Sequence, residues 1–179
     1  MQKICLLLLA ILLSLSVNAQ LFGGFGYSYA SPTGNSGDDF NGYALSMQKD
    51  LLQEKKIQLI LSASASVMND EFDEGPSILG ATSNNLSFAI LGRKKLTINE
   101  NWSASVFLGP FVSWLWYFRP GNIIQDEIYI NSSRLGLEGG IMTTFSLREK
   151  VTLRFIPLHI QADPQDFRHG MMSVLISWQ

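Results

Sequence analysis

The chain has 179 residues, a formal net charge of −2, 46% hydrophobic residues and 16% charged residues. Residues 20–179 suit one domain rather than two, and the near-neutral charge excludes the basic face of a nucleic-acid-binding protein. After residue 19 no segment reaches the roughly 18 uninterrupted apolar residues of a transmembrane helix, which excludes helical membrane spans.

The first 19 residues have the pattern of an export signal. Lys3 precedes an apolar run at 4–15, and the small residues Val17 and Ala19 mark a cleavage site before residue 20. The alternative, a membrane anchor helix, would need roughly 20 apolar residues. Since Cys5 is the only cysteine, the chain from residue 20 has no disulfide and no cysteine-based metal site.

From residue 20 onward, apolar and polar residues alternate with a period of two, which is typical of β-strands. In chain order the pattern predicts strands at 21–29, 40–49, 57–68, 86–98, 102–118, 128–147, 151–160 and 169–178. The clearest is 102–118, where one face carries Trp102, Trp114 and Trp116 and no hydroxyl or charged group. Such a face indicates contact with lipid.

The connections between these strands alternate in length. Those near residues 53, 99 and 149 are short, whereas 30–39, 69–85, 119–127 and 161–168 are longer and hold most of the acidic residues. An even number of strands with this alternation puts both termini on the short-turn side. Because lipid tolerates no open sheet edge, the predicted fold is all-β, an eight-stranded antiparallel up-and-down transmembrane β-barrel occupying residues 20–179.

Two prolines interrupt the pattern. Proline cannot donate a hydrogen bond to a neighbouring strand. We therefore expect a bulge at Gly109 and Pro110, and fraying of the seventh strand after Ile156, where Pro157 follows.

Alternation also assigns side chains to the interior and to the membrane interfaces. Arg93, Arg134, Glu138 and Arg154 point inward, and a buried charge needs a partner. We expect Glu138 to bridge at least one of these arginines, as a structural plug rather than a gated pathway, because an eight-stranded interior has room only for side chains. The predicted aromatic girdle consists of Tyr27, Tyr29, Trp114 and Trp116 at the outer interface, and Trp102 and Trp178 at the inner one.

With its signal segment, its strands and its amphipathic final strand, the chain resembles along its whole length the small outer-membrane β-barrel proteins, the group that includes the OmpX and OmpA barrel types. The terminal aromatic of that group is one residue early here, at Trp178 before Gln179. The resemblance implies a porin-like fold in the outer membrane of a Gram-negative bacterium, contact with its lipid, and insertion by the barrel-assembly machinery. It implies no shared activity, because one fold hosts structural proteins, adhesins and enzymes.

The sequence thus predicts a structural, adhesive or cell-envelope role without an open pore. The acidic loops are the place for an extracellular ligand. No motif indicates a cofactor, a metal or a nucleic acid. His159 and His169 flank the last loop, near Asp163 and Asp166, where we expect solvated side chains rather than a metal site.

Two alternatives stay open. Outer-membrane lipid A deacylases carry a His and, two residues later, a Ser. Here His159 is followed by Gln161, so His159 is the one candidate catalytic residue of a lipid A-modifying hydrolase, and an enzyme is the less favoured interpretation. A soluble exported lipid-binding barrel would need its apolar residues inside and its polar ones outside.

Overall fold

The computed structural model describes residues 20–32, 40–51, 57–73, 78–121, 127–148, 151–164 and 167–178. In chain order its strands are β1 (Leu21–Pro32), β2 (Phe40–Asp50), β3 (Gln58–Asp73), β4 (Ile78–Thr97), β5 (Trp102–Arg119), β6 (Ile128–Arg148), β7 (Val151–Ala162) and β8 (Phe167–Trp178). The eight predicted strands are therefore confirmed. The predicted export signal lies outside the described residues. Within those residues, no helix is long and apolar enough to cross a membrane.

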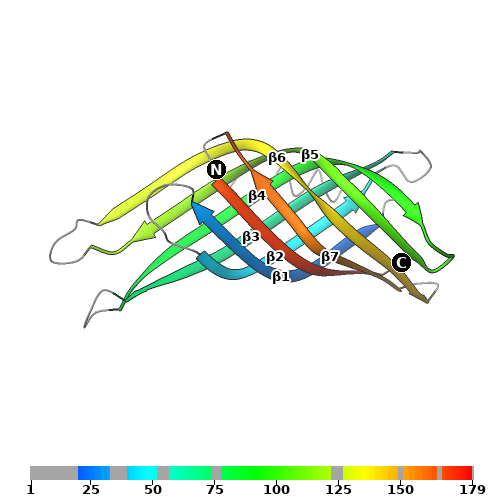
Figure 1. Cartoon of the computed structure of the whole chain (residues 1–179), viewed down its shortest axis with the longest axis horizontal. Coiled ribbons are helices and arrows are strands. Elements are labelled where there is room, and N and C mark those ends of the chain that lie inside the picture. Colours follow the sequence, from blue (N-terminus) through cyan, green and yellow to red (C-terminus); the bar gives the residue numbers. More distant parts are fainter. Residues whose placement is uncertain are drawn as a thin grey trace.

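The strands close into one antiparallel barrel. Each strand pairs with its neighbours in sequence, and β1 also pairs with β8 in a register that includes Gly26↔Ser173. Figure 1 shows the tilted strands wrapping round a common axis, with β1 in blue beside β8 in red. This closure confirms the predicted fold class and removes the open edges that lipid would not tolerate.

The outer face of the barrel is apolar. Phe25, Tyr43, Leu45 and Leu135 lie on it with exposed fractions of 74%, 80%, 66% and 69%. Their neighbours along the strands, such as Ser46, point inward and are buried. An apolar outside and a partly polar inside are the reverse of a soluble barrel and match a barrel surrounded by lipid.

The interior is stratified along the barrel axis into alternating polar and apolar layers. On β4 the buried side chains of Arg93, Leu91, Asn85 and Ala81 occupy four successive layers, starting from the short-turn end. β3 repeats the order with Gln58, then Ile60, then serines, then Met68. The polar side chains are thus collected into two separate groups.

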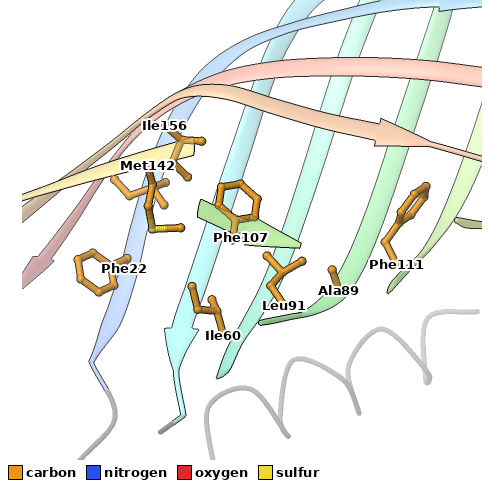
Figure 2. Close-up of a cluster of buried hydrophobic side chains, with 9 residues drawn as sticks. Phe22, Ile60, Ala89, Leu91, Phe107, Phe111, Met142 and Ile156 are labelled. Carbon is orange, nitrogen blue, oxygen red and sulfur yellow. The ribbon is translucent and has the colours of Figure 1, made fainter. Parts of the chain in front are cut away.

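Each apolar layer is a cluster of buried side chains that contact one another inside the barrel. The first consists of Phe22, Ile60, Ala89, Leu91, Phe107, Phe111, Met142, Ile156 and Leu175. Figure 2 shows the labelled members of this layer, which come from strands around the barrel. The second consists of Ala30, Phe40, Met68, Ala81 and Leu115. Because apolar side chains occupy the centre, the barrel is a packed structure rather than a tube.

Strands β3 to β6 are longer than a membrane crossing requires. They contain 16, 20, 18 and 21 residues, whereas a tilted membrane strand needs about 9–11. The predicted long loop at 69–85 is wrong, because β3 and β4 remain paired as far as Asp73↔Ile78. β7 pairs with β6 only from Leu137↔Ala162 onward, so four strands continue as a sheet beyond the barrel wall. At the left of Figure 1 the β3–β4 and β5–β6 hairpins reach furthest.

Both predictions about prolines are wrong in detail. Pairing of β4 with β5 stops at Ala89↔Phe111 and resumes at Gly92↔Leu108 in the same register, so Pro110 interrupts the ladder without a bulge. The bulge lies instead at Pro157, where register shifts appear against both β6 and β8. β7 then continues to Ala162 without fraying. A bulge accommodates proline because the extra residue is not needed as a ladder donor.

Candidate functional site

The polar group at the short-turn end is centred on Asp50. Its carboxylate accepts hydrogen bonds from Arg93 Nη2 at 2.9 Å and from Arg154 Nη2 at 2.9 and 3.1 Å. Gln58 accepts from Arg93 Nε at 2.9 Å, and Gln48 accepts from Arg154 Nη1 at 2.8 Å. One carboxylate is thus shared by two buried guanidinium groups, an arrangement that compensates charge only in part.

Arg154 is held from a second side by an aromatic ring. Its guanidinium carbon lies 3.6 Å from the ring centroid of Phe22, which belongs to the first apolar layer. This cation–π contact fixes the guanidinium at the boundary between the polar and the apolar layer.

Sequence reasoning missed Asp50 and assigned it to a turn. The signal was present, because Ser46 and Gln48 point inward and the same alternation, carried two residues further, puts Asp50 inside. The predicted strand ends at Lys49, one residue before the observed end at Asp50, because the charged pair formed by these two residues resembles the start of a turn. Inward acids at strand ends are therefore worth counting among the interior charges.

The second polar group forms a chain of hydrogen bonds across the barrel. Gln161 Nε2 donates to Glu138 Oε2 at 2.6 Å and to Ser87 Oγ at 2.9 Å, so Gln161 Oε1 is left as an acceptor. His169 Nδ1 lies 3.0 Å from that oxygen and must donate to it. His169 Nε2 is then the acceptor for the hydroxyl of Ser28. The chain runs from Ser28 through His169 and Gln161 to the carboxylate of Glu138.

The Glu138 carboxylate lies beside a histidine, not beside an arginine. The distance from Glu138 Oε1 to His159 Nε2 is 3.3 Å, and both side chains are almost fully buried. The expected bridge to Arg93, Arg134 or Arg154 is therefore wrong. The first apolar layer separates Glu138 from Arg93 and Arg154, and Phe107 of that layer packs edge-on against His159 at 5.3 Å.

Arg134 is paired near the other end of the barrel. Its Nη1 lies 2.9 Å from Asp163 Oδ2, and the Asp163 side chain is only 1% exposed. Asp163 is thus not a solvated loop acid, as the sequence suggested. The four interior charges that alternation grouped together are divided among two polar layers and three different partners.

His159 faces the interior because of the bulge. Strict alternation from Ile156 would turn residue 159 outward, but Pro157 and Leu158 both lie on the outer face. The next residue is therefore turned inward, where His159 is 3% exposed. This position removes the geometric basis for a hydrolase acting through His159 on lipid outside the barrel, and it also corrects the expectation of a solvated loop histidine.

Ser28 and His169 have the contact of a nucleophile and a base, but they lie in the sealed layer. Their exposed fractions are 0% and 1%, and a catalytic serine must be reached by a substrate. We therefore assign this chain of hydrogen bonds to the barrel structure. In the portion of the protein that is described, no group of three or more His, Cys, Asp or Glu side chains is placed to hold a metal ion.

The described members of the predicted girdle have exposed or half-buried side chains. Tyr27 and Tyr29 are 46% and 40% exposed, and Tyr27 donates from its hydroxyl to Asn41 Oδ1 at 2.6 Å. Trp114 packs edge-on against Phe88 at 6.1 Å, and Trp102 stacks on Phe145 at 5.8 Å. Trp116 follows Trp114 on the same half-buried row. The Trp178 side chain lies outside what is described.

Known structures share this architecture. The chain resembles Ail, the attachment invasion locus protein of Yersinia pestis, at 14% identity over 89% of this chain and 96% of that chain, with a TM-score of 0.55. It resembles Neisserial surface protein A at 11% identity over 89% and 96%, with a TM-score of 0.57. A major outer membrane protein from Thermus thermophilus matches at 11% identity over 90% and 98%, with a TM-score of 0.56.

Comparison of sequences adds no closer relative. No family model matches the chain, and no curated protein matches it. At identities this low the similarity to solved structures concerns the fold alone. In strand number, closure and topology, the chain has the fold of the small eight-stranded outer-membrane β-barrel proteins.

Proposed function

We propose that this chain is an integral outer-membrane protein of a Gram-negative bacterium, without an open pore and with a structural or surface-binding role in the cell envelope. In this proposal residues 1–19 act as the export signal and the barrel-assembly machinery inserts the rest. The observation that carries the proposal is the apolar outer face, where Tyr43 is 80% and Phe25 is 74% exposed. In water, so much exposed apolar surface would promote aggregation.

The packed interior supports the absence of a pore. Phe107, Phe111 and Leu91 meet in the first apolar layer, and Met68 and Leu115 contribute to the second. Permeation by ions would require water to enter both layers, which have no polar side chains to hold it. A role in conduction is therefore disfavoured.

The long strands support a surface-binding role. Strands β3 to β6 continue as a paired sheet beyond the length of a bilayer crossing, and β6 has no partner from β7 between residues 128 and 136. With both termini on the periplasmic side, this sheet lies outside the cell. Rigid paired strands present a recognition surface at lower entropic cost than free loops.

The acidic residues at the outer end of the barrel limit which ligands the extended sheet could bind. One structure of Ail holds the heparin analogue sucrose octasulfate. The outer connections and strand tips of the present chain contain Asp38, Asp39, Asp70, Glu71, Asp73, Glu74, Asp126, Glu127 and Asp166. So many carboxylates would repel a sulfated polymer, so we propose a basic or neutral ligand for this surface.

Two competing functions lose support. A soluble lipid-binding barrel needs an apolar interior cavity, but the cavity at the short-turn end of this barrel is lined mainly by polar and charged side chains. A lipid A-modifying hydrolase acting through His159 needs that imidazole near lipid, but it lies inside against Glu138.

The test is expression in a Gram-negative host with the native residues 1–19, followed by membrane fractionation. We expect the protein in the outer-membrane fraction, with a faster electrophoretic migration when it is not boiled, as folded barrels resist detergent. We expect no conductance steps when the purified protein is added to a planar bilayer. Recovery in the soluble periplasmic fraction would contradict the proposal, and stepwise conductance would contradict its closed interior.

Lipid A from the same cells gives the corresponding test of the hydrolase. We expect an unchanged mass profile with and without the protein. Loss of one acyl chain, restored by His159→Ala, would favour the enzyme instead.

A further inference from the structure

A cavity of about 550 Å³ lies at the short-turn end of the barrel. Its described lining consists of Gln20, Phe22, Asp50, Gln58, Arg93, Lys95, Asn101, Ser103, Thr144, Ser146, Leu147, Thr152 and Arg154. The first apolar layer closes the cavity on the inner side, since Phe22 belongs to both. Within the described residues, the cavity is therefore a cup at the end where the strand turns are short.

The described lining of the cup carries more positive than negative charge. Its described lining has three cationic side chains, Arg93, Lys95 and Arg154, and one carboxylate, Asp50. Asp50 is already engaged by both arginines at 2.9 Å. Lys95 is exposed, and its ammonium group has no ion pair within the described part of the chain. A concave, low-dielectric wall concentrates the resulting positive potential inside the cup.

The remaining lining suits an oxygen-rich ligand. Ser103, Thr144 and Thr152 contribute hydroxyl groups from β5, β6 and β7, and Asn101 contributes a carboxamide next to β5. Hydroxyl and amide donors around a lysine bind phosphate or carboxylate oxygens by charge-assisted hydrogen bonds. A cation would be bound less well there, because the one carboxylate of the described lining is already shared by two arginines.

We propose that this cup is a binding site for a small oxyanion, a phosphate or carboxylate group, with Lys95 as its principal charged contact. The ligand enters from the short-turn side, either as a free ion or as the end group of a larger molecule. This inference concerns a site on the opposite end from the extended sheet, and it holds whether or not that sheet binds a ligand.

The test is a titration of the folded, ¹⁵N-labelled full barrel in maltoside micelles, which carry no phosphate of their own. Inorganic phosphate replaces chloride at constant ionic strength, and amide shifts of Ser103, Thr144 and Thr152 report occupancy. We expect saturable shifts confined to the cup. Lys95→Gln should weaken the affinity by about tenfold or more, because one charge-assisted interaction is lost.

Lys94→Gln is the matched control. Lys94 precedes Lys95 on β4 and is exposed on the outer face, so its substitution removes the same charge without changing the cup. We expect wild-type affinity for this variant. Equal weakening in both variants would overturn the proposal, because it would indicate a diffuse electrostatic attraction rather than a binding site.

A second arm distinguishes the sources of the oxyanion. Phosphatidylglycerol mixed into the micelles replaces the free phosphate, with the same two variants. Saturation by inorganic phosphate assigns the site to a soluble anion. Saturation by the lipid alone, again dependent on Lys95 and not on Lys94, assigns it to a phosphate headgroup. Absence of both responses would overturn the site.

Discussion

Asp50 governs the charge balance of the short-turn layer. Its carboxylate is the partner of both Arg93 and Arg154, and all three side chains are at most 7% exposed. Removing one member of a buried ionic group leaves the others uncompensated, which costs more than the group itself contributes. The stability of the barrel should therefore respond more to this residue than to any surface acid.

We expect Asp50→Asn to lower the free energy of unfolding by about 3–5 kcal/mol. Urea unfolding of the barrel in lipid vesicles, followed by tryptophan fluorescence, measures this change. Glu127→Gln removes the same charge at an exposed position and should stay within about 0.5 kcal/mol of the wild type. A similar effect of both substitutions would contradict the assignment of Asp50.

Glu138 and His159 should be energetically coupled. Their side chains are 3.3 Å apart in a sealed layer, where effective dielectric screening is weak. In a double-mutant cycle with Glu138→Gln and His159→Gln, we expect a coupling energy of about 1–3 kcal/mol in urea unfolding. Additive effects would mean that the two side chains are neighbours without an interaction.

The sequence did not predict which of the charged side chains inside the barrel would pair with one another. Alternation correctly turns Arg93, Arg154 and Glu138 inward, because each lies on an uninterrupted stretch of strand. Which charges meet depends on their height along the axis, and that height depends on strand tilt and register. Ser28 and His169, for example, are hydrogen-bonded although 141 positions apart.

At the scale of a strand, the bulge in β7 determines which side chains of that strand belong to the second polar group, the one that contains Glu138. One extra residue at Pro157 keeps His159 and Gln161 inward while Pro157 and Leu158 share the outer face. A shift of one residue exchanges the two faces of a strand. The position of the bulge could not be predicted from the sequence. A proline indicates an irregularity, but the strand can end, bend or continue at that point.

Deletion of Pro157 should prevent correct folding. It would turn His159 and Gln161 toward lipid and leave Glu138 without either contact. Pro157→Ala keeps the residue count and should fold, with a change of about 1 kcal/mol or less. Migration of unboiled samples in gels distinguishes folded from unfolded barrels. Folding of the deletion variant to the same extent would show that the bulge does not set the register.

At the scale of the whole molecule, the apolar face sets the orientation of every strand. Leu45→Arg places a charge in the middle of β2, where Leu45 is 66% exposed. We expect a loss of about 2–4 kcal/mol if this position is near the bilayer midplane, and about 0–1 for Asn69→Arg toward the outer end of β3. Equal losses of unfolding free energy for the two variants, measured by unfolding from vesicles, would contradict the placement of the apolar outer face across the bilayer.

The overall architecture was readable from the sequence because it rests on a period of two repeated over every strand. The apolar residues of 102–118 alone fix which face meets lipid, and β5 follows that range to within one residue. The prediction of a long loop at 69–85 was wrong because the polar composition of this segment resembles a loop, whereas backbone pairing of β3 with β4 continues to Asp73↔Ile78. Outside a bilayer, strands no longer need an apolar face, so the composition signal disappears.

The alternation of layers also makes the barrel an electrical insulator along its axis. Protons move along chains of hydrogen bonds, and the chain that ends at Glu138 is interrupted by Phe107, Ile156 and Leu91 before it could reach Asp50. Ala30, Phe40 and Met68 close the other side. The Asp50 group is therefore connected only with the short-turn end of the barrel, whereas apolar side chains separate the Glu138 group from the Asp50 group on one side and from the outer end on the other.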